Sequence, residues 1–421
     1  MTACPLNSEP IGSSCECKKG FVAQDGKCLP PGLPQGAGYC EAVAGNPIIP
    51  ATGDKLQTER DYLDPAVHPL NLVRTYRMSL AEDHYQASTS LDATWRHEHE
   101  PRMFYVDGLG GASQDSATFE FGDGSVKSFS RYRGSGIWVA DGSADTLTQS
   151  EGTYLYQNAD DGSTWQFDEI GKLLAHTQRN GWIRAYSYSA GSGLLTQVQN
   201  QFGRLMTFSY GNNGKLSTVT VAGVIQLRYQ YDGMSRLSSV QFADNSIKTY
   251  LYENANFPYA LTGIVDELGV RFATYAYDAQ GRGISTQHAG GADLHSVSYA
   301  SAGVATVTDP LGTQRTYNYG TAKGQLAVTG ADKPSGISAS SAASRVQDAN
   351  GFITQETDFL GVSTMYTWDI NRRLPLTTTK AAGLPEVQTT TTQWHPSFKL
   401  PVLVTEADRT TAYTYDTQAT S

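Results

Sequence analysis

Two sets of residues in this sequence have the types and spacing that chemistry requires. His97 and His99 flank one glutamate, and residues i and i+2 of a strand share a face, so both imidazoles could bind zinc or copper from one side. Asp266, Asp309 and Asp358 could supply the paired carboxylates of a glycoside hydrolase. The sequence places no third metal ligand, and turn capping accounts for aspartates that recur once per repeat. We therefore expect no metal and no catalytic residue.

Motifs of the common enzyme classes are absent from the sequence. It contains no Gly-x-Ser-x-Gly elbow, no Walker loop, no Gly-x-Gly-x-x-Gly fingerprint and no His-Glu-x-x-His pair. The sequence thus predicts a protein that is not an enzyme and uses no cofactor.

The cysteines form a third candidate cluster, because all five lie in the first 40 residues. A metal site needs Cys-x2–4-Cys pairs, whereas the close pair here is Cys15-Glu-Cys17, so disulfides are favoured. Two bridges in any of three connectivities would use these four residues: Cys4, Cys15, Cys17 and Cys28. Cys40 is then left over. The stretch from Cys15 to Cys28 resembles the second half of an EGF-like module, and such a module indicates an oxidising compartment, although residues 1–20 show no signal peptide.

Most of the chain is organised by pairs of aromatic residues separated by one position. The second members at 188, 210, 231 and 252 are about 21 residues apart, and later gaps correspond to one or two such units. Both rings of a pair project from the same face of a strand, so we expect a packed aromatic ladder and not a ligand platform. The second members are Tyr188, Tyr210, Tyr231, Tyr252, Tyr277, Tyr319, Trp368 and Tyr415.

Turns separate short strands within each unit. An aspartate that opens a turn and a glycine three residues later are typical of a turn whose carboxylate caps a backbone N–H. The runs between turns are rich in Val, Thr, Ile and aromatic residues, as strands are. One unit is therefore two strands and two turns. The turn residues are Asp232, Asp266, Gly269, Asp278, Gly281, Asp309, Gly312, Asp358 and Gly361.

Composition excludes several other classes. The 421 residues carry a net charge of −10, so there is no basic footprint for nucleic acid, and no apolar run approaches the length of a membrane span. The aromatic content of 10% also argues against disorder.

The repeat resembles the YD repeat of the Rhs (rearrangement hot spot) family, which teneurins and the cocoon subunits of insecticidal toxin complexes share. Tyr229-Gln-Tyr231-Asp232 followed by Arg236-Leu237, and Tyr275-Ala-Tyr277-Asp278 followed by Gly281-Arg282, match its consensus. Upstream, the segment from Gly45 to Tyr76 and the stretch from Trp95 to His99 are similar to the segment that opens the repeat region in bacterial Rhs proteins, although Thr94 replaces the usual glycine.

The resemblance implies an all-β fold in which the YD-repeat sheet spirals into a shell, here a partial one. We expect a small disulfide-rich module in residues 1–43, an N-terminal Rhs-type segment in 44–150 and the repeat array in 151–421. Rhs shells end in a self-cleavage motif followed by a toxin, whereas this sequence stops in a repeat turn at Tyr415-Asp416. Asp309-Pro310 lies in phase as an ordinary turn, so cleavage there is not expected.

Three functions follow from these interpretations. The leading hypothesis is a non-enzymatic scaffold, secreted or at the bacterial cell surface, that encloses or presents a C-terminal toxin for interbacterial competition. Its partners would be that toxin and the secretion machinery, with no nucleic acid and no membrane span. The alternatives are a cell-surface adhesion module that binds a glycan or protein, and a β-solenoid enzyme that acts on glycans.

Overall fold

The computed structural model describes residues 8–11, 14–17, 22–24, 27–29, 43–82, 90–106, 114–132, 136–140, 143–322, 325–334, 342–396 and 398–415. Their regular structure is strands together with two short 3₁₀ helices, η1 (Met78–Glu82) and η2 (Ala289–Gly291). The expected all-β class is confirmed. In this part of the chain no helix could span a membrane.

The largest element is a single antiparallel sheet, which we call the wall. Its 25 strands follow one another in space in the order in which they follow one another in the chain. They are β13 (Thr146–Ser150), β14 (Thr153–Gln157), β15 (Thr164–Asp168), β16 (Leu173–Thr177), β17 (Ile183–Tyr188), β18 (Leu195–Asn200), β19 (Leu205–Tyr210), β20 (Leu216–Val221), β21 (Val224–Tyr231), β22 (Leu237–Phe242), β23 (Ile247–Leu251), β24 (Gly263–Val265), β25 (Arg271–Tyr277), β26 (Gly283–His288), β27 (His295–Ser301), β28 (Val304–Thr308), β29 (Gln314–Ala322), β30 (Gln325–Ala331), β31 (Ser344–Gln347), β32 (Ile353–Thr357), β33 (Ser363–Asp369), β34 (Leu374–Lys380), β35 (Gln388–Trp394), β36 (Pro401–Thr405) and β37 (Thr410–Ala412).

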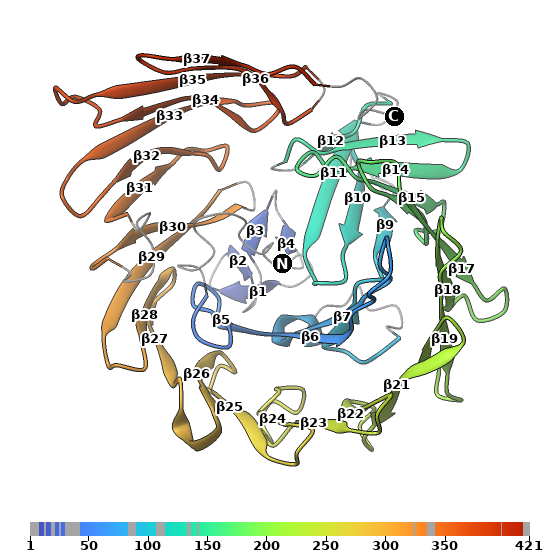
Figure 1. Ribbon diagram of the computed structural model, residues 1–421. Coiled ribbons are helices and arrows are strands. Elements are labelled where there is room, and N and C mark those ends of the chain that lie inside the picture. The colour runs from blue at the N-terminus through green and yellow to red at the C-terminus, as the bar shows by residue number, and fades with distance from the viewer. Residues whose placement is uncertain are drawn as a thin grey trace.

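Bulges recur in the wall at the second aromatic of the pairs. The pairing register shifts between Ser209 and Tyr210 and again between Gln230 and Tyr231. The same shift accompanies Tyr188, Tyr277, Tyr319, Trp368 and Trp394. A bulge bends its strand and increases the local twist, so a bulge in each unit makes the sheet curl. Figure 1 shows the wall curling round until its last strands approach its first, and the sheet stays open because β13 and β37 are not paired with each other.

Two smaller antiparallel sheets lie inside the curve of the wall (Figure 1). We call them together the inner layer (residues 44–140). One consists of β5 (Ile48–Ile49), β6 (Asp54–Tyr62), β7 (Leu72–Arg77) and β8 (Trp95–His97). The other consists of β9 (Arg102–Val106), β10 (Gln114–Glu120), β11 (Val126–Tyr132) and β12 (Val139–Ala140).

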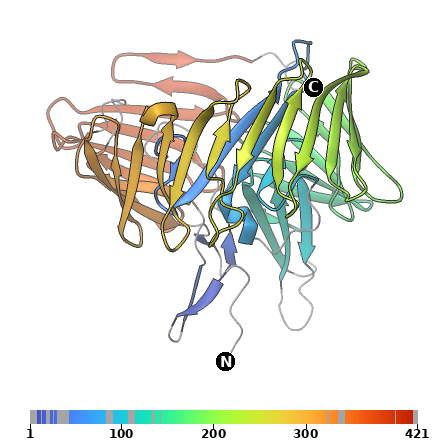
Figure 2. The same cartoon turned by 90° about the horizontal axis from the view of Figure 1, so that it is seen from below.

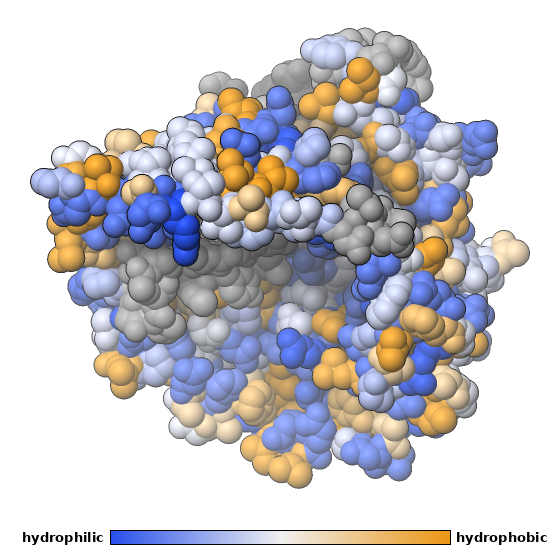
Figure 3. All heavy atoms as spheres, turned by 45° about the horizontal axis from the view of Figure 1, so that its top comes forward, coloured by the Kyte–Doolittle hydropathy of each residue, from blue (hydrophilic) through white to orange (hydrophobic). Residues whose placement is uncertain are grey.

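The hydrophobic core lies between the inner layer and the wall. Leu72 and Trp95 of the inner layer share one cluster of buried residues with Val198, Val219 and Val240 of the wall. A second, smaller cluster joins the inner layer to β27 and β28. The concave face of the wall is therefore its buried face over most of β14–β28, whereas Figure 3 shows apolar and polar side chains interspersed over the outer surface.

The chain before residue 43 contributes two hairpins. β1 (Ser8–Ile11) pairs with β2 (Ser14–Cys17), and β3 (Val22–Gln24) pairs with β4 (Lys27–Leu29). Figure 1 places them near the axis of the curl, and Figure 2 shows that they lie toward one end of it. Cys15 and Cys17 belong to β2 and Cys28 to β4, whereas Cys4 and Cys40 lie outside the described residues. The predicted disulfides therefore stay a prediction.

Candidate functional site

The second aromatic of each pair lies on the concave face of the wall and bonds the wall to itself. The Tyr210 hydroxyl donates to the Leu195 carbonyl (2.7 Å), and that of Tyr231 donates to the Leu216 carbonyl (2.8 Å). Each of these acceptors lies at the beginning of the strand immediately before the tyrosine's own. The same contact joins Tyr277 to Leu261, Trp368 to Ile353 and Tyr415 to Pro401.

Tyr188, Tyr252 and Tyr319 are the remaining second aromatics. Tyr188 and Tyr319 lie in β17 and β29. Tyr252 follows β23, is half-buried, and accepts a hydrogen bond from the Trp95 indole of the inner layer (3.0 Å). Burial raises the pKa of Tyr252, so the hydroxyl remains protonated. These residues have packing partners and leave no open aromatic platform at these positions.

The turn aspartates are engaged by their own turns. Asp309 Oδ1 accepts the N–H groups of Leu311 (3.0 Å) and Thr313 (2.9 Å). The same two-bond pattern occurs at Asp232, Asp266, Asp278 and Asp358. The glycines three residues later have positive φ, between 68° and 82°, at Gly269, Gly281, Gly312 and Gly361. In the turn of Asp232 this position is taken by Ser235, at φ 60°.

The first aromatic of each successive pair contacts a polar residue of the inner layer. These contacts were not predicted from the sequence. Tyr229 donates to Asp61 Oδ2 (2.8 Å). Tyr250 accepts a hydrogen bond from Arg74 Nη2 (2.6 Å). Tyr275 donates to Gln57 Oε1 (3.0 Å), Phe208 stacks on His97 with ring centroids 5.4 Å apart, and Tyr186 lies 3.5 Å from His99 Nδ1. One residue of the inner layer is thus matched to one repeat of the wall over β17–β25.

Arg74 is the centre of this interface. Its guanidinium pairs with the Asp61 carboxylate, and both side chains are 1% exposed or less. It also lies over the rings of Trp95, Tyr250 and Tyr229, at 4.5, 5.2 and 5.5 Å from their centroids. Burial opposes the charged form of Arg74, but the Asp61 carboxylate outweighs this and keeps its pKa well above the ordinary value. Arg74 and Asp61 thus form a buried ion pair, and aromatic rings from both the inner layer and the wall surround Arg74.

Further ion pairs cross between the two layers. Asp64 Oδ1 lies 2.6 Å from Arg204 Nη2, and Glu59 Oε2 lies 2.9 Å from Lys248 Nζ. Within the inner layer, Arg77 pairs with Asp54 (2.9 Å). Charged groups are rarely buried without partners, so the polar face of β6 and β7 can occupy only the position at which these wall residues meet it. The alternating charged residues of Asp54–Tyr62 are the sequence feature that could have indicated these ion pairs, but they do not identify the partner residues in the wall.

Two family models match this chain. A teneurin YD-shell model matches residues 140–294, and the model of a domain of unknown function, DUF6531, matches residues 45–129. The expected resemblance to Rhs/YD-repeat proteins is confirmed over these residues.

Solved structures give the wider comparison of this YD-repeat chain. The Tc holotoxin pore of Photorhabdus luminescens, carrying a mutation in TccC3, aligns at 12% identity and a TM-score of 0.41, over 82% of this chain and 23% of that one. The TcdB2–TccC3 protein without its hypervariable C-terminal region aligns at 12% identity and a TM-score of 0.39, over 91% of this chain and 24% of that one. The chain spans about a quarter of the length of these proteins. No curated protein matches it.

The two histidines considered as metal ligands are core residues of the YD-repeat interface. Burial lowers the pKa of His99 to about 3, and its Nε2 lies 2.8 Å from the Asn71 carbonyl oxygen. Burial also lowers the pKa of His97, which stacks on Phe208. Among the residues that the structure describes, no group of three or more His, Cys, Asp or Glu side chains could hold a metal ion.

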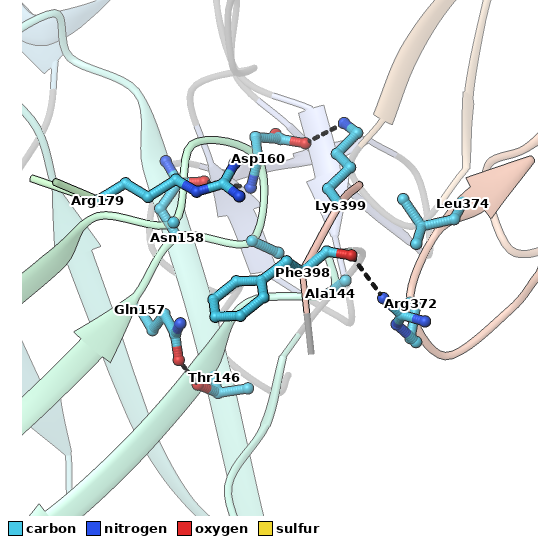
Figure 4. Close-up of a pocket in the computed structure, with 12 residues that line it drawn as sticks. Ala144, Thr146, Gln157, Asn158, Asp160, Arg179, Arg372, Leu374, Phe398 and Lys399 are labelled. Carbon is cyan, nitrogen blue, oxygen red and sulfur yellow. Dashed lines mark hydrogen bonds and ion pairs between the residues drawn. The ribbon is translucent and has the colours of Figure 1, made fainter. Parts of the chain in front are cut away.

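The two ends of the wall meet at a pocket lined by turn residues (Figure 4). Lys399 Nζ lies 2.7 Å from Asp160 Oδ1, and the Arg179 guanidinium lies 5.4 Å from the centroid of the Phe398 ring. Arg372 donates to the Phe398 carbonyl (3.1 Å) and so holds this turn in place. Turns of β33–β36 therefore rest on turns of β13–β17 through side chains, with no strand pairing between them.

Proposed function

We propose that this YD-repeat chain forms part of a non-enzymatic shell that encloses a toxin for delivery, in interbacterial competition or secretion. The observation that supports it is the curl of the wall, whose last strands approach its first, with the inner layer packed on only part of the concave face. Figure 1 shows β31–β35 on the opposite side of the curl from β17–β19. A scaffold of this kind would work by shape and needs no catalytic residue.

Pairing of consecutive strands suits this role. Every strand from β14 to β36 has both edges hydrogen-bonded, so the wall offers few unpaired backbone groups to an unfolded cargo or to a second chain.

The N-terminal hairpins fit a protein that leaves the cytoplasm. We infer that Cys4, Cys15, Cys17 and Cys28 form two disulfides in an EGF-like module and that the chain is secreted or displayed at the cell surface. Alkylation of the protein with and without prior reduction, followed by mass spectrometry, tests this. Four cysteines protected before reduction are expected, and four reactive thiols in protein purified from an oxidising compartment would contradict it.

Enclosure is tested with a reporter peptide that carries one protease site and is fused after Ser421. If the chain encloses it, cleavage should be at least about tenfold slower than for the same peptide free in solution, because proteolysis follows the accessible population. A matched fusion with Arg74→Met, which leaves the Asp61 carboxylate buried without its partner and should unseat the inner layer, should restore fast cleavage. Equal rates for the free peptide and the wild-type fusion would refute enclosure by this chain.

A further inference from the structure

Half of the histidines of the chain lie at one place, where the inner layer meets β16–β19. His68, His97 and His99 come from the inner layer and His176 from β16, and each is at most 8% exposed. The chain has eight histidines in all. Such a concentration of one titratable side chain in a buried interface calls for a reason beyond packing volume.

The ring nitrogens in this cluster are mostly without partners. Both nitrogens of His68, both of His176 and Nε2 of His97 are buried and make no hydrogen bond. Nε of Arg184 is also buried and makes no hydrogen bond. Aromatic rings stand where polar partners would be: Trp165 stacks on His176 at 3.8 Å between centroids, and Trp182 lies 5.3 Å from His68. A neutral imidazole tolerates this environment, whereas an imidazolium would be buried without hydrogen bonds.

Arg184 opposes protonation of the cluster as well, whereas Glu100, whose Oε2 lies 3.6 Å from His97 Nε2, favours protonation of that ring. Burial lowers the pKa of all four histidines, to about 4 for His176 and about 3 for His99. The Arg184 guanidinium adds to this lowering at His68, His99 and His176. The charged groups that face the cluster are Asp61, Arg74, Glu98, Glu100 and Arg102 from the inner layer and Asp161 and Arg184 from the wall.

One carboxyl works in the opposite direction. Burial raises the pKa of Glu98 to about 7, so Glu98 binds its proton more tightly while the layers are together. Its effect therefore offsets about one histidine. The pKa of Glu100 is lowered despite its burial, because His97 and Arg102 lie near it.

We propose that this histidine cluster is an acid-sensitive lock, which holds the inner layer on β16–β19 at neutral pH and releases it on acidification. Above the ordinary histidine range all four rings are neutral in both states, and the seated state is favoured by its packing. When the layers separate, the rings reach water and recover a pKa near 6.5, so protons bind to the separated state first. The seated state thus loses stability as the pH falls from about 6.5 toward the lowered values.

The size of the effect follows from the shifts. Each histidine makes separation up to about tenfold more favourable per pH unit, which for His176 amounts to at most about 300-fold over its whole titration. With four histidines and the opposing Glu98, the separation constant should rise with a slope of about three protons near pH 5.

Hydrogen–deuterium exchange of the full chain between pH 7.5 and pH 4.5, corrected for the intrinsic pH dependence of exchange, tests the lock without any cargo. Backbone amides of β7, β8 and β16–β18 should lose protection with a slope of two to four protons, while β28–β36 stay protected. Protection of both regions down to pH 4.5 would overturn the proposal. Loss of protection in both regions at the same pH would also overturn it, because that is global acid unfolding.

Substitution separates the lock from general acid sensitivity. His176→Gln and His68→Gln each remove one titrating ring, so each should lower the measured slope by about one proton, whatever it does to stability at pH 7.5. His288→Gln is the matched control, because His288 lies at the end of β26 outside the cluster, and its slope should equal that of the wild type. Unchanged slopes in both cluster variants would refute the assignment.

Discussion

Removal of Arg74 should release the inner layer from the wall, and the contacts of this residue allow the cost to be worked out. Arg74→Met removes the partner of the Asp61 carboxylate, which is 1% exposed and stays behind in the interface. Breaking a buried pair from one side costs about 3–5 kcal/mol. The loss of the cation from the box of Trp95, Tyr250 and Tyr229 adds up to about 2 kcal/mol. We therefore expect Arg74→Met to lower the free energy of unfolding by about 4 kcal/mol or more.

The same reasoning predicts that removing more of the site does less harm. In the variant with Arg74→Met, Asp61→Leu, Tyr229→Phe and Tyr250→Phe, both charges and both hydroxyls that bind them are gone. Apolar residues of similar size often replace a buried ion pair at little cost. This fourfold variant should therefore lie within about 2 kcal/mol of the wild type, well above Arg74→Met alone.

Urea unfolding followed by tryptophan fluorescence measures this, because Trp95 contacts Arg74 directly. Arg409→Met is the matched control: Arg409 pairs with Glu406 at the surface, with its side chain 69% exposed, and it should cost under about 1 kcal/mol. A loss below about 1 kcal/mol for Arg74→Met, or a fourfold variant whose loss equals the sum of the single losses, would refute the reasoning.

Three further changes test the repeat and the contact between the two ends of the wall. Tyr231→Phe removes the hydrogen bond to the Leu216 carbonyl and should lower the free energy of unfolding in urea by about 1 kcal/mol. Tyr413→Phe, in a half-exposed position, should lower it by less. Equal losses would contradict a stabilising role for the tyrosine hydrogen bond. Gly361→Ala should lower stability by about 1 kcal/mol, because φ is 82° at this position although a Cβ would meet no atom. Ser235→Gly should raise stability by a few tenths to about 1 kcal/mol, because Ser235 has a φ of 60°. The thermal unfolding temperature should therefore shift in opposite directions in the two variants. Lys399→Ala should change the free energy of unfolding by less than about 1 kcal/mol. It should increase hydrogen–deuterium exchange in the turn that carries Lys399, and 1 M salt should cause the same increase in the wild type. Exchange that does not respond to salt would contradict an ionic contact between the two ends of the wall.

The wall was accessible to sequence reasoning because its information is local. Tyr231 finds its acceptor in Leu216, and Asp309 caps the N–H groups of Leu311 and Thr313, so both contacts repeat within one period. The aromatic spacing and the turn chemistry therefore predicted short antiparallel strands. The wall begins at Thr146, slightly before the expected start of the repeat array, because β13 pairs with β14 although it lacks the aromatic pair.

The inner interface was not accessible in the same way. Tyr229 meets Asp61 from 168 positions away, and Arg74 meets Tyr250 from 176 positions away. His97 and His99 share a strand-like spacing that suits a metal site, yet their surroundings come from β17 and β19 and make them neutral core residues. Nothing in the sequence near either partner names the other.

The sequence by itself determined a repeating, all-β, aromatic-rich chain, because hydrogen bonds and ring contacts within about one repeat length depend only on residue type and spacing. The tertiary structure alone decided which face of the inner layer meets which repeat, that His68, His99 and His176 gather around Arg184, and that turns of β33–β36 rest on turns of β13–β17. These contacts depend on how far the sheet curls. The curl is the sum of many small bends at the bulges, and a sum of that kind cannot be read from any single repeat.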